Sequence, residues 1–161
     1  MNDIADTYGV SRQTLYRLFE NRSALLEYIA TQRVELLAAN LKKFLAQYDR
    51  LSDAVVDGMI HAIKLGRADA LLTEIIRQEV DAHFTTFLFG GTEKVQAAMG
   101  AAWSRVIHAS RDAGELAHDV SDRDVVEWLG NVGAFLNVRP DYNEEDHKRI
   151  LRKFVLPSLC L

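Results

Sequence analysis

Apolar residues recur every three to four positions along most of the chain, and this spacing predicts a series of helices. Asn21 is a favourable N-cap, and the apolar pattern that follows it predicts a long helix to about residue 48. Two further helices are expected over about 52–65 and 68–83, with Gly66 ending the first of them. The aromatic segment 84–91 is expected to form a short helix and a turn.

The second half of the chain shows the same spacing together with clear start signals. Thr92 is expected to cap a long helix that Gly114 ends. Ser121 with Asp124 resembles a capping box and predicts a helix to about residue 138. Asn143 precedes three acidic residues, which favours the start of a final helix. The inner face of that helix is expected to comprise Ile150, Leu151, Phe154 and Val155.

Composition agrees with an all-α fold. The 161 residues include only two prolines, both near the C-terminus, and 48% of the residues are hydrophobic, enough for a real core. The single cysteine, Cys160, excludes an intrachain disulfide and a CxxC zinc pair. No apolar run is long enough to span a membrane, and the acidic N-terminus lacks a signal-peptide core. We therefore expect a cytoplasmic protein without a membrane partner.

Residues 4–19 predict two short helices joined by a glycine turn. Gly9 can adopt the left-handed conformation that ends a helix, and Ser11 is a natural N-cap for the next one. Apolar side chains at Leu15, Leu18 and Phe19 share one face of that second helix. The opposite face is polar, which is the layout of a helix-turn-helix whose second helix enters the DNA major groove.

The side chains of this polar face suit DNA. The net charge of −4 argues against general nucleic-acid binding, but residues 11–22 carry three arginines and one acid. Arginine and glutamine can read base edges, whereas hydroxyls and further arginines suit phosphate oxygens. The predicted DNA-contacting residues are Ser11, Arg12, Gln13, Thr14, Tyr16, Arg17 and Arg22.

This segment resembles the TetR family of transcriptional regulators. The residues that match the family's motif are Ile4, Ala5, Gly9, Val10, Ser11, Thr14, Leu15, Tyr16, Phe19, Arg22, Leu25 and Leu26. The resemblance implies a DNA-binding head and linking helix over residues 1–46. It also implies a helical effector-binding and dimerisation domain over residues 47–161. Such proteins bind operator DNA as homodimers, usually as repressors, and release it when a small molecule binds; we expect a largely apolar effector here.

One departure from the family concerns the head. The family has a further helix before the position of Ile4, whereas this chain begins inside the family's second helix. Two short helices bury their apolar residues poorly without a third. We therefore expect a truncated three-helix head, and weak DNA binding by this exact chain.

Aromatic residues in the expected body suggest a ligand pocket, although plain core packing would also explain them. Glu79 and His83 lie at i and i+4 and could share a metal, but no second pair supports such a site, and a surface pair explains them. No metal site is therefore predicted. His108 is a further polar candidate for orienting a ligand. The predicted ligand-binding residues are His61, Glu79, His83, Phe84, Phe87, Trp103 and Ile107.

Small residues on two of the expected helices predict a dimer interface, with simple burial within one chain as the alternative. Two recognition helices must meet half-sites about 34 Å apart, which gives dimerisation a functional reason. The predicted interface residues are Ala98, Ala101, Ala102, Trp128, Val132 and Phe135.

No catalytic motif is present: the sequence lacks GxSxG, a Walker loop and HExxH, so we expect neither an enzyme nor a cofactor. The rival interpretation is a helical small-molecule-binding or scaffolding dimer that has lost DNA binding.

Overall fold

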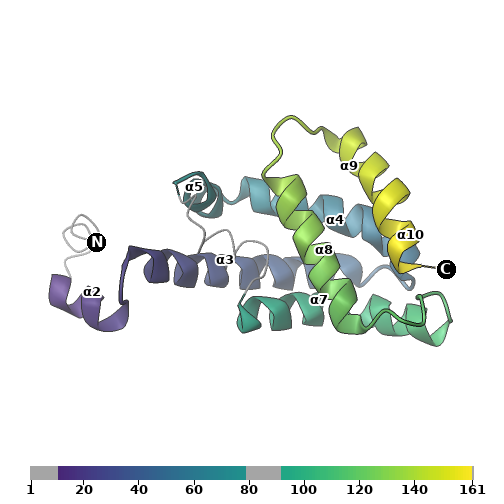
Figure 1. The fold of residues 1–161 in the computed structure, drawn as a ribbon, viewed down its shortest axis with the longest axis horizontal. Helices are drawn as coiled ribbons and strands as arrows, with labels where there is room; N and C mark the ends of the chain where they lie inside the picture. Colours follow the sequence, from purple (N-terminus) through teal and green to yellow (C-terminus); the bar gives the residue numbers. More distant parts are fainter. Residues whose placement is uncertain (1–10, 79–91, 161) are drawn as a thin grey trace.

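The computed structural model describes residues 11–78 and 92–160, and the described chain is all-α, as predicted (Figure 1). The expected first helix of the helix-turn-helix and the aromatic segment 84–91 lie outside the described residues. The helices are α2 (Arg12–Leu18), α3 (Arg22–Leu45), α4 (Leu51–Ala68), α5 (Ala70–Gln78), α7 (Glu93–Asp112), α8 (Asp122–Asn137), α9 (Glu144–Ile150), the π-helix η1 (Leu151–Val155) and α10 (Leu156–Leu159).

Side-chain caps begin the helices where the sequence predicts them. The Asn21 side chain accepts a hydrogen bond from the backbone nitrogen of Ala24 at 2.9 Å, which starts α3. Thr92 caps α7 in the same way. Capping boxes start the next two helices, formed by Ser121 with Asp124 for α8 and by Asn143 with Asp146 for α9. Each cap satisfies backbone N–H groups that the helix itself leaves without partners.

Of the glycines expected to end helices, Gly9 lies outside the described residues, Gly114 ends a helix and Gly66 does not. Gly114 has a φ of 70° and lies just after α7, as predicted. Gly66 was wrongly assigned as a stop, because it lies inside α4, which continues to Ala68. An added Cβ at Gly66 would lie 2.5 Å from the side-chain nitrogen of Asn137. Gly66 therefore makes room for a neighbouring side chain instead of ending the helix.

The last helical segment contains a π-helical turn that changes which residues face inward. Leu151 and Val155 are buried, as predicted, but Phe154 is 63% exposed, so its assignment to the inner face was wrong. A π-turn closes hydrogen bonds between residues five apart and is wider than an α-turn. The apolar spacing of an α-helix therefore does not hold through η1, and Phe154 points to solvent.

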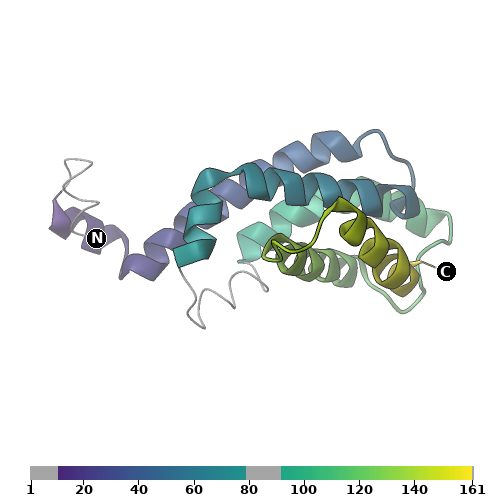
Figure 2. The ribbon, with the colours of Figure 1, turned by 90° about the horizontal axis from the view of Figure 1, so that it is seen from above.

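The helices from α3 onward form a bundle around one main core. α4 runs antiparallel to α3, α7 packs along α3, and α8 crosses α4 and α7 (Figures 1 and 2). The centre of the core holds the indole ring of Trp103, fully buried beside Gly58. At the α3–α4 turn, Arg105 of α7 donates hydrogen bonds to the backbone oxygens of Ala46 and Tyr48. These bonds fix the end of the bundle farthest from α2.

Both views place α2 at the far end of α3, away from the bundle (Figures 1 and 2). The C-terminal half of α3, with Ala38, Leu41 and Leu45 buried, belongs to the main core. One continuous helix therefore joins α2 to the bundle, and it supplies part of the core of that bundle.

Candidate functional site

The exposed polar face of α2 is the first candidate site. Ser11 starts the helix as predicted, because its hydroxyl accepts a hydrogen bond from the backbone nitrogen of Thr14 at 3.0 Å. Gln13, Tyr16 and Arg17 follow at helical spacing and are all exposed, Tyr16 to 53%. An amide, a phenol and a guanidinium therefore share the solvent-facing side of a short helix.

The remaining predicted DNA-contacting residues are placed differently. The Thr14 hydroxyl lies 2.8 Å from the Ser11 hydroxyl, so these two side chains bind each other at the start of α2. Arg22 is exposed at the first position of α3. The side chain of Arg12 lies outside the described residues. The structure thus brings Gln13, Tyr16 and Arg17 together.

The apolar side of α2 is only partly covered. The ring of Phe19 packs against Tyr28 of α3, with their centroids 5.5 Å apart. Leu18, which shares the predicted apolar face, is 64% exposed. Phe19 therefore anchors α2 on α3, while Leu18 leaves apolar surface open.

The second candidate site is an apolar pocket within the bundle, with a volume of about 150 Å³. Five helices line it: α3 with Val34 and Leu37, α4 with Ala62 and Gly66, and α5, α7 and α8 with further residues. These further residues include Leu72, Ile76, Val95, Met99, Gly130, Gly133 and Ala134. None of the described side chains that line the pocket is charged, and only Gln96 and Asn137 are polar. A pocket with this lining suits a neutral, mostly apolar molecule.

None of the predicted ligand-binding residues that the structure describes belongs to this lining. Trp103 and Ile107 are fully buried in the main core, and no described residue supplies a hydrogen-bond partner for the Trp103 indole nitrogen. His61 stacks on Phe44, with ring centroids 4.1 Å apart, and burial with the nearby Lys64 lowers its pKa. Glu79, His83, Phe84 and Phe87 lie outside the described residues. His108, on α7, is exposed, with its Nε2 3.1 Å from Asp122.

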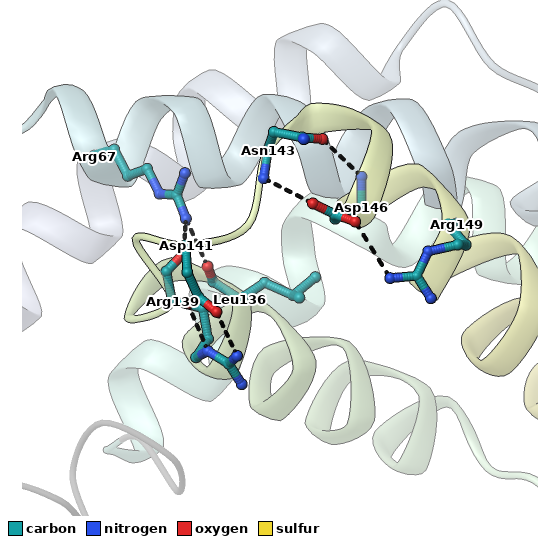
Figure 3. A network of polar contacts seen from close by, with 7 residues as sticks. All are labelled: Arg67, Leu136, Arg139, Asp141, Asn143, Asp146 and Arg149. Atoms are coloured by element: carbon teal, nitrogen blue, oxygen red, sulfur yellow. Dashed lines mark hydrogen bonds and ion pairs between the residues drawn. The ribbon is translucent and has the colours of Figure 1, made fainter.

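The position of Asn137 depends on contacts at the end of α8. The Arg67 guanidinium of α4 donates hydrogen bonds to the backbone oxygens of Leu136 at 2.8 Å and Arg139 at 2.9 Å (Figure 3). Arg139 in turn pairs with Asp141, at a shortest distance of 2.6 Å. These bonds hold the backbone on both sides of Asn137 against α4, so its side chain lies over Gly66.

An ion pair connects two of the helices that line the pocket, α3 and α5. Arg33, next to Val34, donates hydrogen bonds from Nε at 2.7 Å and Nη2 at 2.6 Å to one carboxylate oxygen of Asp69. The other Asp69 oxygen accepts from the backbone nitrogen of Leu72 at 2.9 Å. Burial raises the pKa of Asp69, but the hydrogen bonds from Arg33 and the α5 backbone outweigh it, so the pKa is lowered overall. The charged carboxylate therefore ties α3 to the start of α5.

The predicted dimer residues divide between core and surface. Ala102 and Val132 are buried within the chain, Ala98 is half-buried, and Ala101 is exposed. Trp128 and Phe135 lie exposed on α8 at 43% and 41%, respectively. Val138, just after α8, and Phe154 of η1 are exposed as well. Trp128 donates a hydrogen bond to the hydroxyl of Ser158, so its ring lies against the C-terminal helix.

The sequence did carry a signal for the pocket that was interpreted differently. Gly130, Gly133 and Ala134 were expected to let another helix approach closely, whereas they line the pocket. An added Cβ at Gly130 would meet no atom within 4 Å. Small side chains facing a gap between helices therefore mark this pocket, but the gap itself becomes visible only in three dimensions.

Comparisons of the chain with protein-family models, curated proteins and solved structures return no match. In the described part of the chain, no helix combines the length and apolarity that a membrane span needs. Among residues 11–78 and 92–160, no three His, Cys, Asp or Glu side chains come together as metal ligands would.

Proposed function

We propose that this protein is a DNA-binding transcriptional regulator of the TetR type, in which a small, largely apolar ligand controls binding to an operator. The observation that carries the proposal is the exposed face of α2. Gln13, Tyr16 and Arg17 share it on a short, Ser11-capped helix that stands away from the bundle. The amide suits a base edge, and the guanidinium and phenol suit phosphates or guanine.

The apolar pocket supports the second half of the proposal. It touches α3 at Val34 and Leu37, and α3 is the helix that leads to α2. A ligand that fits one packing of α3 better than another shifts the population of the two arrangements. In a dimer, that shift changes the spacing of the two recognition helices relative to adjacent major grooves. The ligand thereby lowers operator affinity, as expected for a repressor.

A homodimer is part of this proposal, and the exposed aromatic residues of α8 and η1 support it. Trp128, Phe135 and Phe154 present apolar rings to solvent, and Trp128 contacts Ser158 of the C-terminal helix that follows η1. Aromatic residues are enriched at the centres of protein interfaces. The second copy would cover these rings and would bring a second α2 to the other half-site.

The test begins with selection of bound sequences from a random double-stranded DNA pool, followed by fluorescence anisotropy titrations of the selected site. We expect Arg17→Ala to weaken binding and to reduce the salt slope by about one, because one phosphate contact is lost. Tyr16→Phe should weaken binding to a smaller extent. Arg123→Ala is the matched control, because Arg123 is exposed on α8 in the bundle and its loss changes the net charge equally. Equal effects of R17A and R123A on the weak binding expected of this chain would refute the assigned DNA face.

A second candidate function is favoured by the pocket alone. A helical ligand-binding dimer without DNA binding would use the same pocket and the same exposed aromatic surface. It predicts ligand binding and dimerisation together with no selected DNA sequence, so the same experiment separates the two functions.

A further inference from the structure

We infer that the apolar pocket takes a neutral, single-ring molecule that carries one hydrogen-bonding group, and that Asn137 recognises this group. The inference deepens the proposed function and rests on its ligand-binding half, because it names the class of molecule that the pocket selects.

The size of the pocket limits the ligand to about one ring. Its volume is about 150 Å³, and an apolar cavity of about this size accepts a benzene molecule. Small residues provide the space, because Gly130, Gly133 and Ala134 of α8 and Ala62 of α4 all line the pocket. A molecule with two fused rings would extend beyond this volume and leave part of its apolar surface in contact with solvent.

The lining limits the charge of the ligand. No charged side chain is among the described residues of the wall, and burying an unpaired carboxylate or ammonium group is strongly unfavourable. The ion pair of Arg33 with Asp69, which adjoins the lining residue Val34 in sequence, is already satisfied by its own contacts and by the start of α5. Acids and amines that are ionised at neutral pH are therefore excluded.

One polar group within this wall is placed for recognition. Asn137 carries a neutral amide, and no described residue supplies a hydrogen-bond partner for it. It lies over Gly66, where any larger side chain would collide with its nitrogen, and Arg67 holds the adjacent backbone. An amide both donates and accepts, so it can pair with a hydroxyl or a carbonyl of the ligand. A ligand that pairs with this half-buried amide gains a hydrogen bond inside a mostly apolar pocket.

The test uses fluorine NMR titrations of the full chain with four probes. These are 4-fluorophenol, fluorobenzene, 4-fluorobenzoate and 6-fluoro-2-naphthol, which differ in polarity, charge and size. We expect 4-fluorophenol to bind about fivefold more tightly than fluorobenzene, the effect of about one neutral hydrogen bond. The benzoate should show no binding, and the naphthol should bind more weakly than the phenol. A preference for fluorobenzene, binding of the benzoate, or tighter binding of the naphthol would overturn the inference.

Two matched variants test the role of Asn137. Asn137→Leu should reduce the preference for the phenol over fluorobenzene to less than about twofold, because the amide is lost and the volume is nearly kept. Asn131→Leu makes the same change on α8 at a position outside the pocket lining and should keep the preference. Loss of the preference in both variants, or in neither, would show that Asn137 does not recognise the ligand. The order of the four probes on the unaltered chain remains decisive even if Asn137→Leu does not fold.

The failure of this inference and the failure of the proposed function give different results. If the chain binds 4-fluorophenol selectively but selects no DNA sequence, the ligand class is supported and the proposed DNA-binding function is refuted. If the chain binds DNA through Arg17 but binds the four probes in another order of affinity, the DNA-binding function is supported and the proposed ligand class is refuted.

Discussion

Removal of the Asp69 carboxylate should destabilise the bundle by the loss of two interactions. Asp69 lies at the end of α4, and its carboxylate binds both α3 and α5. The Asp69 side chain is only 5% exposed, and it binds both Arg33 of α3 and the backbone of Leu72 in α5. Loss of a helix cap costs about 1 kcal/mol. The Arg33 side chain is 40% exposed, so solvent weakens the ion pair, and we take about 1 kcal/mol for it. Asp69→Ala should therefore lower the free energy of unfolding by about 2 kcal/mol.

Urea denaturation followed by circular dichroism at fixed protein concentration measures this change. Asp69→Asn keeps a good capping group and loses the charge, so it should cost about half as much as Asp69→Ala. A double-mutant cycle with Arg33→Met isolates the ion pair. Asp49→Ala is the control, because Asp49 pairs with Arg105 at 3.0 Å but its side chain is 89% exposed. The reasoning fails if D69A and D49A have equal effects, or if the cycle shows no coupling.

The same pair predicts a dependence on pH. The pKa of Asp69 is lowered in the folded protein, so its ionised form contributes stability above its unfolded pKa of about 3.9. That contribution is lost as the pH falls through the lower folded pKa. The difference in unfolding free energy between the unaltered chain and D69N should stay constant above about pH 5 and shrink in more acidic solution. A difference that grows on acidification would contradict the assignment.

Three further stability measurements test other parts of the fold. Gly58→Ala should lower the free energy of unfolding by about 1–2 kcal/mol, because the added Cβ would lie 2.7 Å and 2.9 Å from core side chains. Gly130→Ala meets no atom within 4 Å and should raise it by up to about 1 kcal/mol. The opposite order would refute the packing at these helices. Leu151→Ala should cost about 2–5 kcal/mol and Phe154→Ala within about 0.5 kcal/mol, whereas an α-helical register through this segment predicts a large cost for both. Burial and the nearby Arg67 lower the pKa of His147 against the opposing effect of two neighbouring acids. The folded chain should therefore lose stability as the pH falls below about 6.5. His147→Leu should reduce that loss when unfolding is measured between about pH 8 and 5. An unchanged pH dependence in that variant would show that another group is responsible.

Local signals in the sequence were sufficient to predict where the helices begin. Asn21, Thr92, Ser121 and Asn143 each cap a helix through bonds to residues three positions along the chain. Such bonds depend on neighbours in sequence, so a pattern can identify them. Phe154 was misplaced because the π-turn changes the helical period, and no local residue type indicates that change.

The site was less predictable because its walls come from five helices. Gly66 was interpreted as a helix stop, yet it matters because Asn137, far along the chain, needs the space above it. Trp103 was interpreted as a pocket residue, yet it fills the core beside Gly58. An aromatic residue or a glycine has the same local signature in both roles, and only the packing of distant helices distinguishes them. The exposed face of α2, in contrast, needs only the periodicity of one short helix, and Gln13, Tyr16 and Arg17 lie on it.

Because α3 is continuous, a small rotation of this helix at the pocket moves its distant N-terminal end by a larger distance. Leu41 lines the pocket, and Arg22 begins the same helix 19 positions earlier. At a rise of 1.5 Å per residue, the two positions are about 28 Å apart. A tilt of about 5° around Leu41 would move the α2 end by about 2.5 Å, close to half the rise of one helical turn. A small tilt of α3 at the pocket would thus become a displacement of α2 that is large enough to change its fit to a rigid binding surface.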